Sequence, residues 1–271
     1  MLKILLARWQ QGHRTIKYPD GPAPDMADRF RGRPVVDASK CPADCRACAD
    51  ACPTGAITLS GTMQMDLGKC LFCTDCLVAC PAQCITFTTD YRLAVRQRQD
   101  LLLTPDQQVL HLAAALEGKL KRLFGRSLKL RQVSAGGCGA CEADVNVLGT
   151  IGWDLGRFGI QMVASPRHAD GLLVTGPVTR NMEIALKKTY DAVAAPKLVI
   201  AVGACAIAGG PYIGHQQVRG GADTLVPVDL YIPGCPPHPM TILDGLLRLI
   251  GRIEDGARKD LAPPGAVPAG K

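Results

Sequence analysis

The chain has 271 residues, of which 47% are hydrophobic and 20% charged, so a packed core of about two domains is expected and global disorder is excluded. Its formal net charge of +7 is typical of nucleic-acid-binding proteins, and its thirteen cysteines are typical of disulfide-stabilised secreted proteins. The sequence opens without a secretory signal pattern and holds no apolar run of the roughly 18–20 residues that a membrane span needs. We therefore expect a cytoplasmic protein whose clustered cysteines bind metal.

Residues 1–12 are predicted to form a short helix that is apolar on one side. The apolar side chains are those of Leu2, Leu5, Leu6 and Trp9. This side either packs on the helix's own domain or contacts a partner subunit or a membrane surface. Residues 18–34 are rich in Pro, Gly, Asp and Arg and are predicted to be irregular.

Residues 35–90 contain an internal repeat. Three cysteines recur 28 residues later: Cys45, Cys48 and Cys52 return as Cys73, Cys76 and Cys80. The leading cysteines, Cys41 and Cys70, lie 29 residues apart because the first copy has one extra residue. A short apolar run suited to a small strand follows each copy, at 56–59 and at 84–87. Two similar halves of this size predict a compact, pseudo-symmetric module.

The two cysteine runs, each of which ends in proline, are typical of [4Fe-4S] binding. Three closely spaced thiolates can hold one cubane cluster, and the fourth cysteine of each run then ligates the other cluster. The first cluster is assigned to Cys41, Cys45, Cys48 and Cys80. The second is assigned to Cys70, Cys73, Cys76 and Cys52. Two zinc sites, which also take four cysteines each, are the alternative. The odd cysteine, Cys84, is predicted to be a buried free thiol.

A connecting helix is predicted to follow. Residues 104–107 form a capping box with proline at the first helical position, and apolar residues recur at helical spacing as far as Leu123 before Gly125 ends the helix. Much of the excess charge gathers here, because residues 101–131 carry a net +4 whereas residues 132–271 are neutral. A basic face that could read nucleic acid is therefore not expected.

From residue 128 onward, apolar runs alternate with helix-like stretches. The runs are 128–133, 159–164, 172–174, 198–202 and 230–232. The helix-like stretches are 141–149, 181–194 and 239–253. Strands that alternate with helices predict an α/β domain with a mostly parallel sheet, in which ligands sit beyond the carboxyl ends of the strands. The Ala-, Pro- and Gly-rich tail after residue 253 is predicted to be flexible.

Four more cysteines lie directly after predicted strands of this sheet: Cys138, Cys141, Cys205 and Cys235. Loops from parallel strands open on one edge of the sheet, so these thiolates can converge there, and the adjacent glycines let backbone N–H groups approach sulfur. A third iron–sulfur cluster is predicted, with zinc as the alternative on cysteine count alone. Neither a G-x-G-x-x-G motif nor a Walker lysine is present.

Glu142 and His238 flank these loops. Either could relay protons or tune a cluster, or could instead cap a helix or form a structural hydrogen bond. The sequence offers no Ser–His–Asp arrangement, carboxylate pair or nucleophile elbow. The chain is therefore expected to carry electrons without a catalytic residue of its own.

The segment from 127 to 253 resembles the small, cluster-bearing subunit shared by membrane-bound (group 4) [NiFe] hydrogenases and respiratory complex I. The matching motifs are 137–142, 173–179, 203–206 and 233–237. The first 90 or so residues resemble the two-cluster ferredoxin subunit of the same complexes, so the chain resembles a fusion of two subunits. Complex I subunits place two cysteines in tandem, whereas Cys138 and Cys141 are separated by two residues, as in hydrogenases.

The resemblance implies a two-cluster ferredoxin-like α+β domain at 1–100, a helical connector at 101–126, a flavodoxin-like domain at 127–253 and a tail at 254–271. It implies three [4Fe-4S] clusters. The third, on Cys138, Cys141, Cys205 and Cys235, would lie next to a nickel–iron centre on a partner large subunit. Membrane-arm subunits and other electron-transfer subunits are the further partners, and these would attach the chain peripherally to the cytoplasmic membrane, as in formate hydrogenlyase.

Two alternatives stay open at this point. One is a complex I-like quinone oxidoreductase or a hydrogenase-related complex without the nickel–iron centre. The other is a metal-bearing regulator of nucleic acid, which the charge distribution disfavours. A [4Fe-4S] cluster with four thiolates carries about −2, so three of them reduce the net charge to about +1. The remaining basic residues at 119–131 form a candidate docking strip for a partner.

Overall fold

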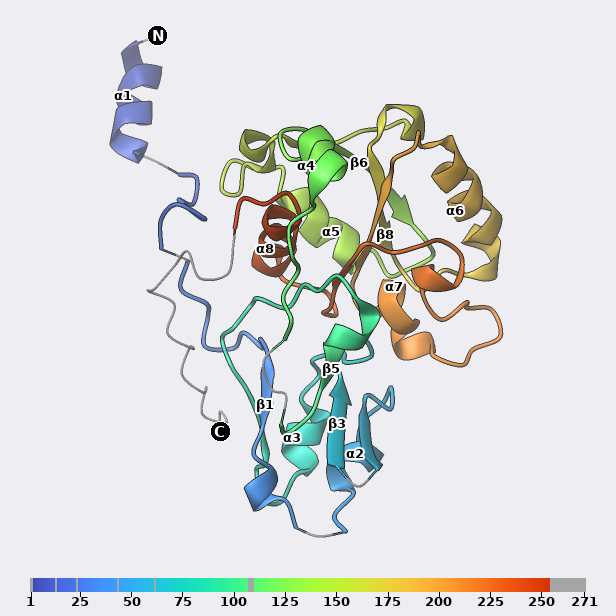
Figure 1. Cartoon of the computed structure of the whole chain (residues 1–271). Helices are drawn as coiled ribbons and strands as arrows, with labels where there is room; N and C mark the ends of the chain where they lie inside the picture. Colours follow the sequence, from blue (N-terminus) through green and yellow to red (C-terminus); the bar gives the residue numbers. More distant parts are fainter. Residues whose placement is uncertain are drawn as a thin grey trace.

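The computed structural model describes residues 2–12, 14–22, 24–42, 44–60, 62–106 and 110–253. Elements of the first part are α1 (Leu2–Gln11), β1 (Pro34–Val36), α2 (Ala47–Asp50), β2 (Ile57–Ser60), β3 (Thr62–Asp66), α3 (Asp75–Ala79), β4 (Ile85–Phe87) and β5 (Leu102–Leu103). Those of the second part are α4 (Gly118–Phe124), β6 (Leu128–Ser134), α5 (Ala140–Val147), β7 (Ile160–Met162), β8 (Gly171–Thr175), α6 (Arg180–Ala192), β9 (Leu198–Val202), α7 (Ala204–Ala208), β10 (Leu230–Ile232) and α8 (Pro239–Leu249). Figure 1 shows a larger body around β6 and β8, a smaller module with β1, β3 and β5, and α1 projecting away from both.

The smaller module consists of two strand–helix–strand units, and each unit contains one of the two cysteine runs. The first unit is β1–α2–β2 and the second is β3–α3–β4. Strands pair between the units rather than within them: β1 is antiparallel to β4, and β2 is antiparallel to β3. Helices α2 and α3 contact each other, so the two cysteine runs lie side by side. The predicted strands after the two cysteine runs are confirmed as β2 and β4, while β3 and the short strand β5 that pairs with it were not predicted.

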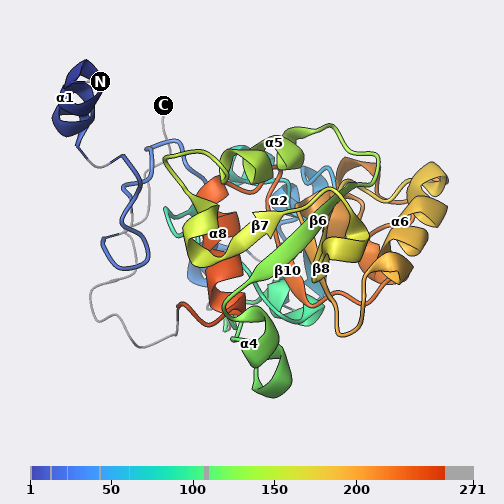
Figure 2. The same cartoon turned by 90° about the horizontal axis from the view of Figure 1, so that it is seen from above.

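The larger body is built on a five-stranded parallel sheet with the order β10-β9-β8-β6-β7, which confirms the predicted mostly parallel sheet. Side chains of successive residues point to opposite faces, as a pleated strand requires. Leu173 packs with α5 and α8, whereas its neighbour Leu172 packs with α6. Both faces are therefore covered, and Figure 2 shows α8 and α6 on the two sides of the strands.

The smaller module packs against one edge of this sheet. Tyr231 of β10 and Ala201 of β9 share a buried apolar cluster with Ile57, Met65 and other residues of the module. Val95 and Tyr231 exchange backbone hydrogen bonds, in which the amide donor and carbonyl acceptor lie 3.0 and 2.9 Å apart. The two cysteine-rich parts are thus joined by a continuous core.

Helix α8 is buried along its whole length. The sequence predicts a helix over 239–253, and the structure ends it at Leu249. It also meets the segment around Ala94, so closely that a Cβ on Gly245 would lie 2.6 Å from the Cβ of Ala94.

The predicted connecting helix from Thr104 to about Leu123 is wrong over residues 104–106, where the capping box is predicted, and over 110–117, and it is correct from 118 onward, where α4 forms. Residues 107–109 lie outside the described residues. The segment 110–117 is extended, and its amides at Ala113 and Leu116 donate to the carbonyls of Ala94 and Leu249. Every third residue of this segment is buried, namely Leu110, Ala113 and Leu116. An extended chain with three residues per turn produces this period as well as a helix does.

The predicted N-terminal helix is confirmed as α1, and none of its described residues is buried. Residues 14–33, apart from residue 23, contain neither helix nor strand, which agrees with the irregular segment predicted there. Across the described residues, no helix combines the length and the apolar character needed to cross a membrane. The predicted flexible tail at 254–271 lies outside the described residues.

Candidate functional site

The cysteines of the larger body gather at the carboxyl edge of the parallel sheet. Cys138 and Cys141 follow β6 at the start of α5, Cys205 follows β9 in the first turn of α7, and Cys235 follows β10. The topology therefore brings four thiols from three distant loops to one edge.

The electrostatics of these thiols reflect their proximity. Burial raises the pKa of Cys141 strongly, and the nearby thiolates of Cys205, Cys235 and Cys138 raise it further. Burial likewise raises the pKa of Cys205 to about 12, with Cys235 and Cys138 contributing. A cation close to Cys141 and Cys205 would favour their thiolate forms and so oppose this increase in pKa.

Glycine backbones leave room for the sulfur atoms of this third set. A Cβ on Gly203 would lie 2.6 Å from Sγ of Cys141, and a Cβ on Gly210 would lie 2.6 Å from Sγ of Cys205. Gly203 also has φ 91° and ψ 155°, a backbone region that only glycine occupies readily. The third set thus depends on glycine for both conformation and space.

Replacing Gly203 with alanine is expected to disturb the third set. The forced backbone conformation costs about 1–3 kcal/mol, and the new methyl group displaces the Cys141 sulfur. Denaturant unfolding and the iron content of the purified chain measure the two effects, and both should fall. Gly152→Ala is the matched control, because no atom lies within 4 Å of the added Cβ. Equal behaviour of the two variants would contradict the role given to Gly203.

Glu142 and His238 both serve structural roles in this structure. Glu142 lies in the first turn of α5 and accepts hydrogen bonds from Ser134 Oγ at 2.5 Å and Thr175 Oγ1 at 2.7 Å. Burial alone would raise the pKa of Glu142, but these two hydrogen bonds outweigh it and the pKa is lowered. His238 caps α8, since its Nδ1 accepts a hydrogen bond from the amide of Met240 at 3.1 Å. Sequence reasoning foresaw the capping role but not Ser134 or Thr175.

In the smaller module, thiols from the two runs approach each other across the α2–α3 contact. Burial is the largest cause of the raised pKa of Cys48. The thiol of Cys80, which belongs to the other run, raises this pKa next, and Cys41 raises it by a smaller amount. Burial raises the pKa of Cys76 to about 12, with Cys52 of the other run as the next contributor and then Cys73. The exchange of the fourth cysteine between the runs, predicted from the spacing, is compatible with this arrangement.

Several backbone amides point at these sulfur atoms. The amide of Ala56 donates to Cys52 Sγ at 3.2 Å, and that of Phe72 donates to Cys70 Sγ at 3.3 Å. Such hydrogen bonds stabilise thiolates that bind a metal cluster. Cys45 is half-buried, and its own amide donates to the carbonyl of Pro42 at 3.3 Å. Residue 43, between Cys41 and Cys45, lies outside the described residues.

The thirteenth cysteine, Cys84, is buried at 2% exposure, as predicted. Its amide donates to Cys80 Sγ at 3.3 Å. Burial raises the pKa of Cys84 to about 12, and the neighbouring Cys80 and Cys41 raise it further. Cys84 therefore lies beside the first set.

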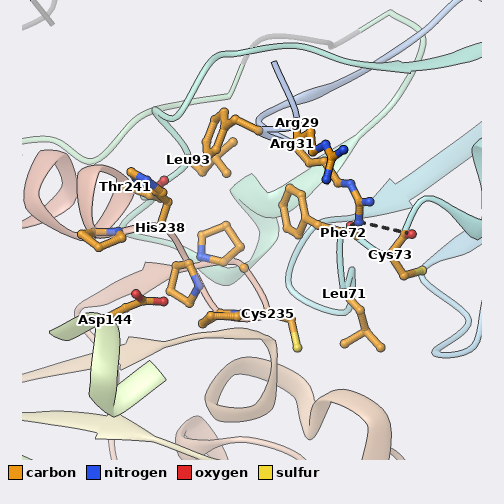
Figure 3. A pocket seen from close by; sticks show the side chains of 16 residues that line it. Arg29, Arg31, Leu71, Phe72, Cys73, Leu93, Asp144, Cys235, His238 and Thr241 are labelled. Carbon is orange, nitrogen blue, oxygen red and sulfur yellow. Dashed lines mark hydrogen bonds between the residues drawn. The ribbon is translucent and has the colours of Figure 1, made fainter. Parts of the chain in front are cut away.

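A pocket of about 590 Å³ separates the second and third sets of cysteines. Figure 3 shows Cys73 of the second set and Cys235 of the third set on its wall, with Arg29 and Arg31 on one side and His238 and Asp144 on the other. The thiolate of Cys73 is also among the groups that raise the pKa of Cys235, after burial and Cys138. The second and third sets are therefore neighbours.

The described residues contain no group of three or more His, Cys, Asp or Glu side chains placed to hold a single metal ion. Within each set the thiols are electrostatic neighbours, which their pKa values show.

Comparison with known proteins places the second half of the chain among subunits of redox complexes. Residues 138–249 match the family described as NADH ubiquinone oxidoreductase, 20 Kd subunit. The chain is 41% identical over 152 residues to formate hydrogenlyase subunit 7 of Escherichia coli strain K12, covering 56% of this chain and 58% of that subunit. It is 37% identical over 145 residues to the probable membrane-bound hydrogenase subunit mbhJ of Pyrococcus furiosus, covering 54% of this chain and 87% of that subunit.

It is also 45% identical over 118 residues to an NADH-quinone oxidoreductase subunit of Clostridium beijerinckii, covering 43% of this chain and 70% of that protein. Among solved structures, a chain of the archaeal membrane-bound sulfane sulfur reductase is 35% identical, with a TM-score of 0.44, and the match covers 52% of this chain and 78% of that one.

Proposed function

The chain belongs to the family of the 20 kDa subunit of NADH ubiquinone oxidoreductase. From this premise we propose that it is an iron–sulfur electron-transfer subunit of a membrane-associated [NiFe] hydrogenase complex of the formate hydrogenlyase type. Three [4Fe-4S] clusters would relay electrons to or from a partner large subunit. The matched part spans little more than half of formate hydrogenlyase subunit 7, so the activity of that complex enters here as part of the proposal.

The observation that carries the proposal is the third set of thiols at the carboxyl edge of the sheet. Cys138, Cys141, Cys205 and Cys235 come from three loops, within the matched residues 138–249. The residues fit a cubane cluster: the donors are all thiols, and glycine at 203 and 210 leaves space beside two of the sulfur atoms. When bound, such a cluster takes up and returns single electrons.

The smaller module supports two further clusters. We assign Cys41, Cys45, Cys48 and Cys80 to the first, and Cys70, Cys73, Cys76 and Cys52 to the second. The proximity of Cys48 to Cys80 and of Cys76 to Cys52 supports this exchange between the runs. The amides that donate to Cys52 and Cys70 are suited to thiolates that bind metal. On this assignment the chain is a fusion of a ferredoxin-type module with a hydrogenase-type small subunit.

The arrangement of the thiols suggests an order for the relay. Cys235 of the third set and Cys73 of the second line the same pocket. Cys76 of the second set lies near Cys48 of the first. Burial raises the pKa of Cys76 most, Cys52 and Cys73 raise it next, and Cys48 raises it further. We therefore propose a path from the third set through the second to the first, which these two neighbouring pairs of thiols support.

The third set has an open side, which we assign to the large subunit. Cys138 and Cys235 are exposed, whereas Cys141 is buried and Cys205 is half-buried. Contact with a large subunit would cover the exposed thiols, exclude water and bring the nickel–iron centre next to the third set. Membrane-arm subunits would hold the complex at the membrane, as the names of the hydrogenase relatives suggest.

A second candidate is a complex I-like quinone oxidoreductase, or a related complex without the nickel–iron centre. The similarity to the NADH-quinone oxidoreductase of Clostridium beijerinckii favours this alternative. The separation of Cys138 and Cys141 by two residues favours the hydrogenase, since complex I subunits carry the two cysteines in tandem.

The complex purified through a tag on this chain distinguishes the two candidates. We expect a co-purified large subunit that contains nickel, and hydrogen evolution when a reduced low-potential donor is supplied. A complex without nickel that reduces a quinone instead would replace the hydrogenase proposal with the second candidate. Chelation of free metal before the assay controls for nickel bound adventitiously.

A further inference from the structure

Arg31 contacts the loop that carries Cys73. Its Nη1 donates to the carbonyl oxygen of Phe72 at 2.9 Å and to that of Cys73 at 3.4 Å. Figure 3 shows the guanidinium beside this loop, with the hydrogen bond to Cys73 drawn as a dashed line. Phe72 and Thr74 on either side of Cys73 have φ of 54° and 74°, a left-handed conformation that non-glycine residues keep only where neighbouring contacts hold it.

The residue before it, Phe30, contacts the loop that carries Cys235. The rings of Phe30 and His238 lie edge to face, with their centroids 5.3 Å apart. On its other side, His238 meets the ring of Trp153 at 6.1 Å, and its Nδ1 is held by the amide of Met240. His238 is therefore a fixed support, three residues after Cys235.

The backbone that follows fixes these two side chains in place. The amide of Gly32 donates to the carbonyl of Thr88 at 2.8 Å, and that of Arg33 donates to the carbonyl of Asp90 at 2.9 Å. Gly32 lies so close to this segment that a Cβ would come within 2.3 Å of the carbonyl oxygen of Asp90. The backbone directly after Phe30 and Arg31 is therefore held against residues 88–90 by these hydrogen bonds.

We propose that Phe30 and Arg31 form a brace that sets the separation between the second and third iron–sulfur clusters and thereby the rate of electron exchange between them. Arg31 fixes the Cys73 loop, and Phe30 fixes the Cys235 loop through His238. The two residues are positioning residues, because each acts through a loop that carries a cysteine. The inference rests on the proposed function and adds to it a specific role for the irregular segment before β1.

The test compares variants of the full chain in its complex. Arg31→Gln removes the two hydrogen bonds to the Cys73 loop, and Phe30→Leu removes the ring contact with His238 while keeping apolar volume. Arg31→Lys keeps the charge but not the planar fork of donors. Arg29→Gln is the matched control, since Arg29 lines the same pocket and, among the described residues, donates no hydrogen bond to the Cys73 loop.

Two readouts report the separation directly. One is the magnetic interaction between the reduced second and third clusters in electron paramagnetic resonance spectra, and the other is the rate of electron exchange after rapid mixing with a reductant. We expect Arg31→Gln and Phe30→Leu to weaken the interaction and slow the exchange several-fold. Arg31→Lys should fall between Arg31→Gln and the unmodified chain, and Arg29→Gln should match the unmodified chain.

Wild-type behaviour of Arg31→Gln would overturn the proposal. An equal effect of Arg29→Gln would also overturn it, because charge near the pocket would then explain the result without a brace. Iron and sulfide are measured on the same samples. Their absence from the unmodified chain would refute the proposed function itself, whereas full cluster content with unchanged coupling in the variants would refute only the brace.

Discussion

Cys141→Ala is expected to remove the third cluster, lowering the iron content from about twelve to about eight atoms per chain, because three of four thiolates cannot complete a [4Fe-4S] site. Cys141 is the buried member of its set, and its sulfur sits against Gly203. Electron exchange with the large subunit should be lost along with this cluster, while the first and second clusters remain reducible. Iron and acid-labile sulfide assays together with electron paramagnetic resonance measure these effects.

Cys84→Ala is the matched control for this loss. Cys84 is also a buried cysteine, and it lies beside Cys80 without belonging to any of the three sets of four. The control should keep about twelve irons per chain and all three cluster signals. Full iron content in Cys141→Ala, or loss of a cluster in Cys84→Ala, would show that the ligands have been wrongly assigned.

The second large effect concerns stability and centres on Asp244 of α8. Asp244 is fully buried and accepts hydrogen bonds from Tyr18 Oη at 2.6 Å and from Arg248 Nε at 2.8 Å. Asp244→Ala removes the carboxylate that pairs with the buried guanidinium of Arg248 at 2.8 Å, which costs about 3–5 kcal/mol of unfolding free energy. It also removes the hydrogen bond from Tyr18 to α8. Denaturant unfolding of the purified chain measures the loss.

Asp191→Ala in α6 serves as the control for that substitution. Asp191 is exposed on a helix surface, so its removal should change the unfolding free energy by no more than about 0.5 kcal/mol. A loss of the same size in both variants would mean that the buried contacts of Asp244 with Tyr18 and Arg248 contribute nothing specific.

The parallel sheet could be predicted from the sequence because its central strands are buried on both faces. Strands β8 and β9 appear as uninterrupted apolar runs, and every residue in them is buried. Once strands alternate with helices, the convergence of Cys138, Cys205 and Cys235 follows from topology alone, since the loops after parallel strands share an edge. The assignment of these cysteines to a cluster remains a prediction.

The connector shows where periodicity is insufficient. Leu110, Ala113 and Leu116 recur at a spacing that suits a helix, yet the chain is extended because Ala113 and Leu116 bond to Ala94 and Leu249. These partners are distant in sequence, so nothing local distinguishes the two conformations. Strand β3 was also missed, although the sequence does contain a signal for it. Met63 and Met65 alternate with polar residues, as in a strand that is buried on one face.

Several residues around the site could not be predicted because their roles arise only from tertiary contact. Ser134 and Thr175 become partners of Glu142 when β6 and β8 lie side by side. Phe30 and Arg31 lie in a segment without regular structure, far in sequence from His238 and Cys73. The basic strip at 119–131 stays a prediction as a docking surface.

The central claim is that twelve of the thirteen cysteines hold three [4Fe-4S] clusters. The most direct test is to determine iron, acid-labile sulfide and zinc in the full chain purified without oxygen. We predict about twelve irons and about twelve sulfides per chain, with zinc at trace level. Zinc bound in the absence of sulfide would contradict the account.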